Sequence, residues 1–375
     1  MLNIGIITGN LKRNATGMGA YAFNIIEGLM ENNQINIIRH KEGDGLSGCN
    51  SVTPYYPPVP FWYFAWSNLL NFHKREFKNL DLVHNATQYP ISASIAPCYI
   101  ITIHDLIPLL YPSLVTPFYA AQSKWLLPII LKKATRIIAV SQSTKDDIVK
   151  LIKINPEKID VVHHGVSNHF RIPEPDEIQA FKKRYNLNFP FILFVGALEP
   201  KKNIPNLIKA FNLCLQEEPS LKLVIAGKKS WKYEIIFSTI ESLNLKSKVI
   251  FFDFFPYEEL PLLYSAAEVF VFPSIYEGFG FPPLEAMKCG TPVIVSNRSS
   301  LPEIVGSQGL MVNPNDIREL STMILNVISE PNFKKNISEY YLKRSGLFTW
   351  ERCIEETMKS YERALLIKSD SIKEY

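Results

Sequence analysis

The sequence contains few cysteines, and their spacing matches neither a disulfide framework nor a zinc site. There are five in 375 residues, an odd number, scattered along the chain and without any Cys-x-x-Cys pair. This spacing argues against a small disulfide-stabilised secreted domain and against a zinc module. A reducing compartment fits these cysteines best.

Long apolar runs are also missing. No run approaches the roughly 20 residues that a membrane-spanning helix needs, and residues 1–13 are typical of a strand rather than of a signal peptide. We therefore expect a cytoplasmic protein.

The chain has no strong charge of either sign. Its net charge is +4, and residues 1–165 carry 15 Lys and Arg against 11 Asp and Glu, whereas the remaining residues carry 25 of each. This excess is too small for a nucleic-acid channel, so no nucleic acid is expected as a partner. It is compatible with an anionic acceptor or with peripheral contact at the inner face of the cell membrane.

What the sequence does contain is an ordinary globular composition, with 47% hydrophobic and 20% charged residues and room for two domains. Short apolar runs predict strands that alternate with helices. The first set of strands is expected at residues 2–8, 82–84, 99–103, 136–140 and 158–162, and the second at residues 191–195, 222–225, 249–252, 269–272 and 292–295. This alternation predicts an α/β fold with two doubly wound parallel sheets, which bind ligands at the carboxyl ends of their strands.

One segment is unusually aromatic. Seven aromatic residues fall within twelve positions, namely Tyr55, Tyr56, Phe61, Trp62, Tyr63, Phe64 and Trp66. Basic residues follow at 74, 75 and 78, and a second segment carries Lys124, Trp125, Lys132, Lys133 and Arg136. Two interpretations stay open: core aromatics with a solvated basic flank, or a surface that meets the membrane.

Residues 274–292 combine two carboxylates and two glycines at a strand-to-helix junction. Gly278 and Gly280 allow the loop backbone to approach a ligand, and N–H groups near a helix N-terminus favour a phosphate. Glu277 and Glu285 are suited to accept protons from sugar hydroxyls. The alternative is that Glu285 only complements the helix dipole and Glu277 is a solvated loop charge.

The Glu-x7-Glu spacing in this segment resembles the signature of retaining glycosyltransferases of family 4, the group 1 glycosyl transferases of polysaccharide biosynthesis. The resemblance continues through residues 194–203, 263–268, 301–303 and 348–350. It implies the GT-B fold, with two facing Rossmann-like domains. We expect an acceptor-binding domain at 1–170, joined by a C-terminal helix at 350–375 that crosses back to it, and a nucleotide-sugar-binding domain at 171–349, with a hinge near 165–190.

The resemblance also implies roles for individual residues. Lys202 is expected to contact the donor diphosphate, with Lys201 as the nearest match to a second cation, although Ala197 stands where some members have arginine. Glu277 is expected to bind the donor hexose, and Glu285 the ribose hydroxyls. The remaining donor-binding residues are expected to be Gly17 and Gly19 of a first glycine-rich loop, Gly278, Phe279, Gly280 and Phe281 of the second, and Phe254 and Phe255 beside the base.

His104 ends a predicted strand together with Asp105 and resembles the family histidine that contacts the sugar near the reacting carbon, so we expect it to be catalytic with Lys202 and Glu277. His84 has a weaker claim to line the acceptor site, and His163 and His164 are interpreted as structural. A histidine packed at a sheet edge is the alternative for His104.

These features predict a retaining hexosyltransferase that moves a sugar from a UDP-glucose or GDP-mannose type donor to a saccharide or lipid-linked acceptor in polysaccharide biosynthesis. No Asp-x-Asp pair of the metal-chelating kind occurs in the sequence, so we expect neither a metal nor another cofactor. The alternatives are a non-catalytic nucleotide-sugar-binding protein, a sugar-nucleotide epimerase, and a phosphorylase with pyridoxal. A dehydrogenase is disfavoured because no Gly-x-Gly-x-x-Gly follows the first strand.

Overall fold

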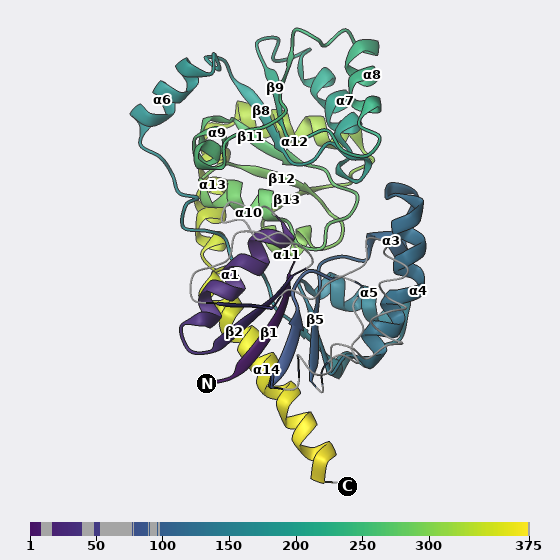
Figure 1. Cartoon of the computed structure of the whole chain (residues 1–375). Helices are drawn as coiled ribbons and strands as arrows, with labels where there is room; N and C mark the ends of the chain where they lie inside the picture. The colour runs from purple at the N-terminus through teal and green to yellow at the C-terminus, as the bar shows by residue number, and fades with distance from the viewer. Residues whose placement is uncertain are drawn as a thin grey trace. The chain divides into compact units, whose positions relative to one another are not determined.

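The computed structural model describes residues 1–8, 17–39, 49–52, 77, 79–88, 90, 96 and 98–373 (Figure 1). The aromatic segment at 55–66 lies outside these residues, so its interpretation stays a prediction. The chain divides into two compact units. Unit 1 comprises Met1–Pro112, Pro117–Gly165 and Thr349–Tyr375, and unit 2 comprises Ser113–Thr116 and Val166–Phe348.

Unit 1 is built on a parallel sheet of seven described strands in the order β3-β2-β1-β4-β5-β6-β7. The strands are β1 (Asn3–Thr8), β2 (Gln34–Arg39), β3 (Asn50–Val52), β4 (Leu82–Asn85), β5 (Tyr99–Ile103), β6 (Arg136–Ala139) and β7 (Ile159–Val161). Its helices are α1 (Met18–Met30), α3 (Ile107–Leu110), α4 (Pro117–Lys133), α5 (Gln142–Ile152) and α14 (Trp350–Lys373).

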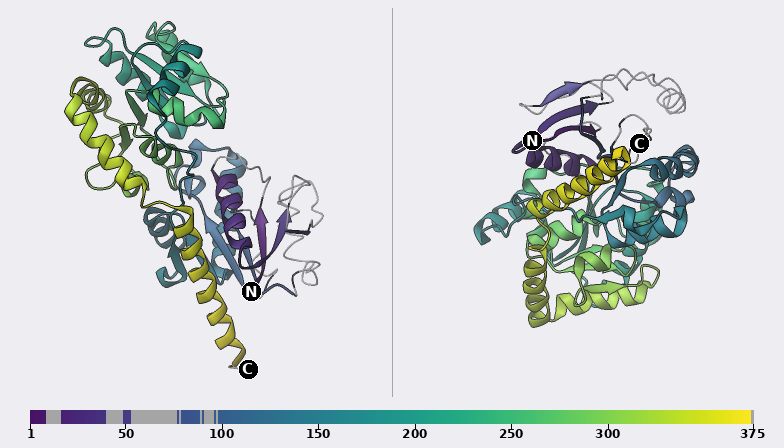
Figure 2. Two further views of the ribbon diagram at one scale, coloured as in Figure 1. Left: turned by 90° about the vertical axis from the view of Figure 1, so that its left-hand side faces the viewer. Right: turned by 90° about the horizontal axis from the view of Figure 1, so that it is seen from below.

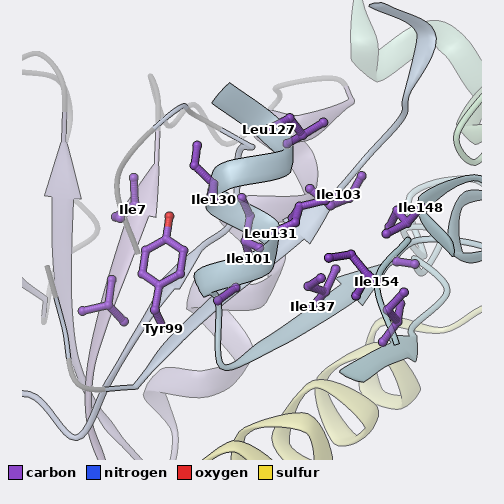
Figure 3. Close-up of a cluster of buried hydrophobic side chains, with 14 of the residues drawn as sticks. Ile7, Tyr99, Ile101, Ile103, Leu127, Ile130, Leu131, Ile137, Ile148 and Ile154 are labelled. Carbon is purple, nitrogen blue, oxygen red and sulfur yellow. The ribbon is translucent and has the colours of Figure 1, made fainter. Parts of the chain in front are cut away.

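Helices cover both faces of this sheet, because successive residues of a strand point to opposite sides. Ile4 and Ile6 of β1 belong to a buried cluster with α1 and α14. Ile7 belongs to a second cluster, in which Leu127 and Ile130 of α4 pack against β5 and β6 (Figure 3). Burial on both faces explains why these strands read as nearly continuous apolar runs in the sequence.

The C-terminal helix returns to unit 1, as the GT-B resemblance implies. Figure 2 shows α14 beside α1, and the two helices are in contact. Gly165 permits this return, because a Cβ at that position would lie 2.3 Å from the backbone nitrogen of Trp350. Asp160 anchors the helix from the sheet: its carboxylate accepts hydrogen bonds from Arg136, Ser360 and Arg363.

Unit 2 contains a second parallel sheet, with the order β10-β9-β8-β11-β12-β13. Its strands are β8 (Phe191–Val195), β9 (Lys222–Ala226), β10 (Val249–Phe252), β11 (Val269–Phe272), β12 (Val293–Ser296) and β13 (Leu310–Val312). Its helices are α6 (Pro175–Arg184), α7 (Ile204–Cys214), α8 (Glu234–Ser242), α9 (Leu260–Ala266), α10 (Phe281–Lys288), α11 (Leu301–Val305), α12 (Ile317–Ser329) and α13 (Pro331–Ser345). Helix α7 packs on α8 and α12, whereas α10 packs on α9, α11 and α13.

Both sheets reverse their strand order beside a central strand. The reversal lies between β1 and β4 in unit 1 and between β8 and β11 in unit 2. In open α/β sheets the loops that leave the carboxyl ends of two such strands diverge to opposite faces and leave a crevice for a ligand. A ligand of unit 2 is therefore expected beside the loops that follow β8 and β11.

Two local expectations need correction. Gly19 was expected in a loop but lies inside the first turn of α1, which begins at Met18, because Gly17 already adopts the non-helical N-cap conformation with φ 61°. The residue type of Asn203 favours a side-chain cap at the start of α7. Asn203 does occupy the N-cap position, but in a left-handed conformation, and its amide donates instead to the carbonyls of Pro273 and Pro314.

Candidate functional site

Lys202 and Glu277 form an ion pair at the strand-order reversal of unit 2. Lys202 ends a short 3₁₀ turn after β8, and Glu277 lies in the loop after β11. The Lys202 Nζ donates to Glu277 Oε1 at 2.7 Å and lies 4.7 Å from the centre of the Phe272 ring. Both side chains are buried, with 8% and 9% of the residues exposed. The structure thus brings together two residues that the sequence analysis had placed separately.

The charge on Glu277 is maintained by its neighbours. Burial by itself would raise the pKa of this carboxyl, but the positive charges of Lys202 and Lys201 and the hydrogen bond from Lys202 together hold the pKa below its usual value. Glu277 is therefore ionised at neutral pH. An ammonium group has three N–H donors, and the bond to Glu277 uses one of them, so Lys202 can hold this carboxylate and an anionic ligand together.

Serines after β12 fix the loop that carries Glu277. The Ser299 hydroxyl accepts from the backbone N–H of Glu277 at 2.9 Å, and Ser300 donates to the carbonyls of Glu277 and Phe279. The Ile275 N–H donates to the Lys201 carbonyl at 2.8 Å, which joins this loop to the one after β8. Sequence reasoning missed both serines, although their position directly after a predicted strand placed them at the same sheet edge.

The second glycine-rich segment leads into α10. Gly280 is the N-cap of this helix and has φ 135°, a conformation that favours glycine. Phe279 is buried and its ring packs edge-on against Phe281. The Leu284 N–H donates within the helix to the Gly280 carbonyl, and prolines at 282 and 283 have no N–H. The N–H of Leu284 is therefore engaged within the protein.

Glu285 is the fifth residue of α10, at the beginning of its second turn. The Tyr264 hydroxyl donates to Glu285 Oε2 at 2.8 Å. Burial raises the pKa of Glu285 to about 7, and the bond from Tyr264 offsets only part of this effect. Near neutral pH the Glu285 carboxyl therefore takes up and releases a proton. Tyr264 belongs to the segment 263–268 that already carried the family resemblance.

The two aromatic residues after β10, Phe254 and Phe255, have different surroundings. Phe254 is 70% exposed, and Lys228 from the loop after β9 lies 5.7 Å from its ring centre. Phe255 instead packs against Tyr185 and Phe252, with ring centres 5.2 Å away in each case. Of the two residues expected beside the base, Phe254 presents its ring to solvent and Phe255 belongs to an aromatic cluster near α6.

His104 follows β5 in unit 1, at the carboxyl edge of that sheet. Its Nε2 lies 2.8 Å from the Ala86 carbonyl, and its backbone N–H donates to Gln88 Oε1 at 2.8 Å. Burial lowers the pKa of His104 to about 4, although the bond to Ala86 raises it in part. The ring is therefore neutral, with its proton on Nε2 and a lone pair on Nδ1. Beside it, the buried Thr87 hydroxyl has no hydrogen-bond partner among the residues that the structure describes.

His84 does not line a ligand site. It is fully buried, and its ring nitrogens lie 2.7 Å from the Tyr361 hydroxyl and 2.8 Å from the Thr102 hydroxyl. This corrects the sequence-based suggestion, because both nitrogens are already bonded within the core. His164 is also buried, with its ring centre 4.6 Å from that of Tyr21, whereas His163 is only partly buried.

Comparison with known families identifies the chain. The profile described as glycosyl transferases group 1 matches residues 175–344, and the profile described as glycosyltransferase family 4 matches residues 15–169. The chain belongs to the group 1 glycosyltransferases of family 4. The Lys202–Glu277 pair lies within the first of these matches, and His104 within the second.

Curated relatives of this glycosyltransferase include two O-antigen enzymes. The O-antigen chain mannosyltransferase B of Escherichia coli is 32% identical over 234 residues, which cover 62% of this chain and 61% of the relative. The O-antigen chain mannosyltransferase RfbU of Salmonella typhimurium is 34% identical over 241 residues, with 64% of each chain covered. The match thus spans less than two thirds of the length of these relatives.

Solved structures support the GT-B fold of the glycosyltransferase. A sucrose-phosphate synthase from Thermosynechococcus elongatus superposes with a TM-score of 0.78 at 21% identity, covering 98% of this chain and 100% of that one. The Anabaena HepE protein in complex with UDP and glucose gives a TM-score of 0.79 at 18% identity, covering 96% and 100%.

Among the described residues, no three His, Cys, Asp or Glu side chains gather as they would around a metal ion. Within the same residues, no helix combines the length and apolarity that crossing a bilayer requires.

Proposed function

We propose that this glycosyltransferase is a retaining hexosyltransferase that takes its sugar from a nucleotide-diphosphate donor and passes it to a saccharide or lipid-linked acceptor in polysaccharide biosynthesis. The observation that carries the proposal is the Lys202–Glu277 pair at the strand-order reversal of unit 2, with Glu285 on the following helix. A donor of this kind presents a diphosphate and two sets of hydroxyl groups, and the three side chains offer a cation and two carboxyls.

Each group has a defined task in this proposal. Lys202, with Lys201 near by, stabilises the charge that develops on the departing diphosphate, supported by the N–H groups of Gly280 and Phe281. The ionised Glu277 accepts a hydroxyl proton of the hexose, and Glu285 binds the ribose. His104, neutral at pH 7, contacts the sugar through its Nδ1 lone pair.

Retention of configuration is proposed to arise by attack on the face from which the phosphate leaves. The acceptor hydroxyl forms the new bond to the anomeric carbon as the bond to the phosphate oxygen breaks, and the leaving phosphate takes the acceptor proton. Trapping of a covalent glycosyl-enzyme would contradict this mechanism. Metal independence is part of the proposal and is tested by EDTA, which should leave turnover unchanged.

The relatives named as mannosyltransferases favour mannose as the sugar, while the HepE structure, with UDP and glucose, keeps a uridine donor in consideration. The deciding experiment incubates the protein with GDP-mannose or UDP-glucose and a lipid-linked oligosaccharide, and detects the extended product by mass spectrometry. Donor hydrolysis without acceptor separates an enzyme from a nucleotide-sugar sensor. Binding without transfer or hydrolysis would favour the sensor, and a changed nucleotide sugar the epimerase.

We also propose that α4 rests on an anionic membrane surface. Phe118, Trp125 and Ile129 of this helix are 60%, 74% and 43% exposed, and their spacing places them on one face. Lys124, Lys132 and Lys133 are exposed on the same helix, which has no acidic residue. Arg136 does not belong to this surface, because it is buried in β6 and paired with Asp160.

Exposed aromatic and basic residues on one helix are typical of interfacial binding. We expect the protein to float with vesicles that contain phosphatidylglycerol and not with phosphatidylcholine alone, and Trp125→Ser to lose this flotation while nucleotide binding is kept. Equal flotation of the variant and the wild type would contradict this part of the proposal.

A further inference from the structure

A chain of four hydrogen-bonded side chains runs through the core of unit 1 towards His104. The Tyr361 hydroxyl of α14 meets His84 Nδ1 at 2.7 Å, and His84 Nε2 meets the Thr102 hydroxyl at 2.8 Å. The Thr102 hydroxyl in turn lies 2.9 Å from the Tyr21 hydroxyl of α1. All four residues are fully buried.

The Tyr21 ring connects this chain to His104. Its centre lies 5.2 Å from that of the His104 ring, with the planes at 78°, an edge-on contact. Thr102 and His104 are two positions apart at the end of β5, so a local displacement of this strand would affect both side chains. The hydroxyl of Tyr21 thus fixes the ring that borders the imidazole.

The four hydrogen-bonded side chains admit only a few arrangements of their protons. Burial lowers the pKa of His84 to about 3, so its ring is neutral and has one N–H and one lone pair. The Thr102 hydroxyl has a single proton, so it can donate to only one of its two neighbours. Removing this one hydroxyl would leave both His84 and Tyr21 without a partner on that side.

We propose that Thr102, His84 and Tyr361 are positioning residues: they hold the Tyr21 ring against His104, so that Nε2 keeps its bond to the Ala86 carbonyl and Nδ1 keeps its lone pair for the substrate. The inference rests on the proposed role of His104 in sugar transfer.

The surroundings argue against a purely space-filling role. The buried cluster that contains Tyr21 and Tyr361 is largely apolar and includes Ile4, Ile6, Ile100 and Ile138. Apolar side chains of similar volume would fill this core without the desolvation of a histidine and three hydroxyls. A fully paired polar chain in such a place instead selects one arrangement of the groups that it joins.

The test compares two substitutions at one position. Thr102→Val keeps the shape and removes the hydroxyl, whereas Thr102→Ser keeps the hydroxyl. We expect Thr102→Val to lower kcat by about 10- to 100-fold through misplacement of His104, with the KM for the donor nucleotide sugar nearly unchanged. Thr102→Ser should restore most of kcat. Rates are measured well below the melting temperature of each variant.

Tyr361, at the far end of the hydrogen-bonded series of side chains, supplies a second variant. Tyr361→Phe should lower kcat in the same direction, although Tyr361 belongs to α14 and touches His84 rather than His104. Tyr341→Phe is the matched control, because this buried tyrosine of unit 2 also loses a hydrogen-bonded hydroxyl, which accepts from the Leu310 N–H and donates to the Val293 carbonyl. We expect the control to lose stability and keep kcat.

Nitrogen-15 NMR of labelled histidine follows His104 directly. The wild type should show the proton on Nε2, and Thr102→Val should show a mixture of tautomers. Unchanged kcat and an unchanged His104 signal in Thr102→Val would overturn the inference. If His104→Ala kept full transfer activity, the proposed role of His104 would fail, while the tautomer measurement would still decide whether the chain positions the ring.

Discussion

Glu277 and Glu285 lie eight positions apart, yet their surroundings shift their pKa values in opposite directions. The two lysines near Glu277 stabilise its charge, and burial next to Tyr264 destabilises the charge of Glu285. Two neighbouring carboxyls with opposite shifts indicate different tasks at one site. A donor of this kind has hydroxyl groups on its hexose and on its ribose. The permanently ionised carboxylate of Glu277 and the titrating carboxyl of Glu285 are suited to these two different partners.

The raised pKa of Glu285 predicts how stability depends on pH. Its value in the native protein is about 7, against 4.5 in the unfolded chain. The stabilising contribution is complete below pH 4.5 and is lost as the pH rises through 7, because the unfolded chain ionises this carboxyl first. Between these limits the free energy of unfolding of the wild type should fall by on the order of 1–3 kcal/mol relative to that of Glu285→Gln. Urea unfolding at several pH values measures this difference.

Glu277→Gln is the matched control for this experiment, since the lowered pKa of Glu277 has the opposite sign. Its contribution is present above the unfolded pKa and is lost as the pH falls through the native one. If Glu285→Gln followed the wild type at every pH, Glu285 would not be the group that titrates near 7.

A second prediction at this scale concerns Lys202. Lys202→Ala should cost about 3–5 kcal/mol of stability, because Glu277 would remain buried without its partner. It should also lower the transfer rate by roughly 10²–10³ through loss of charge stabilisation at the diphosphate. Adding Glu277→Gln should restore much of the stability and none of the activity.

The control for Lys202 is Lys246→Ala, which breaks an exposed ion pair with Glu241 at 2.6 Å. Solvent screens this exposed pair, so it should contribute little to stability, and its loss should leave transfer unchanged. A rate loss below about threefold in Lys202→Ala would show that Lys202 does not act on the transition state.

At the scale of helices, strands and loops, a close backbone contact shapes the edge of the unit 2 sheet. The loops after β8 and β9 approach closely: the Leu198 N–H donates to the Lys228 carbonyl at 2.9 Å. A Cβ on Gly227 would lie 1.9 Å from the Gly196 carbonyl oxygen. This contact involves backbone on both sides and cannot be relieved by turning a side chain, so it sets the direction in which the loop after β8 leaves towards Lys202.

Gly227→Ala should therefore destabilise the protein by about 1–3 kcal/mol, the usual range for overpacking, and weaken nucleotide binding by displacing the loop before Lys202. Thermal unfolding and calorimetric titration with UDP and GDP measure the two effects. Gly346→Ala is the control, because a Cβ there would be 3.4 Å from its nearest neighbour. Wild-type nucleotide affinity in Gly227→Ala would contradict the proposed coupling.

Regular elements could be predicted from the sequence where their pattern is long enough. β8 and β11 have the predicted limits, because each is a run of apolar residues buried on both faces. β10 also has the predicted limits, although three of its four residues are only partly buried. β3 and β13 were not predicted, since three residues are too few to show a period, and β2 was missed as well. The identities of Lys202, Glu277 and Glu285 were also apparent from the motif.

Their pairing was not predictable. The Lys202–Glu277 bond joins residues 75 positions apart, and the bond from Tyr264 to Glu285 joins residues 21 positions apart. Such contacts depend on which strands become neighbours and on burial, and neither appears in a local pattern. The same holds for His84, whose two bonds reach Thr102 and, 277 positions away, Tyr361.

At the scale of the whole molecule, each unit has its own sheet and its own buried core, and the expected diphosphate, hexose and ribose contacts of Lys202, Glu277 and Glu285 all lie in unit 2. A ligand stabilises the part of a protein that binds it. A nucleotide at 100 times its dissociation constant should therefore add about 2.7 kcal/mol to the stability of unit 2. Hydrogen exchange should reveal this as slower exchange in the loops after β8 and β11 and in the strands of their sheet.

The sheet of unit 1 should exchange at nearly the same rate with and without the nucleotide, because none of these three side chains belongs to it. The measurement compares exchange by mass spectrometry with UDP, GDP and no ligand, and Lys202→Ala serves as the control that should lose the slower exchange in unit 2. Equal protection of both sheets would mean that nucleotide binding stabilises the two units as one. Protection confined to unit 1 would place the nucleotide on the other sheet and contradict the assignment of Lys202, Glu277 and Glu285 to the donor.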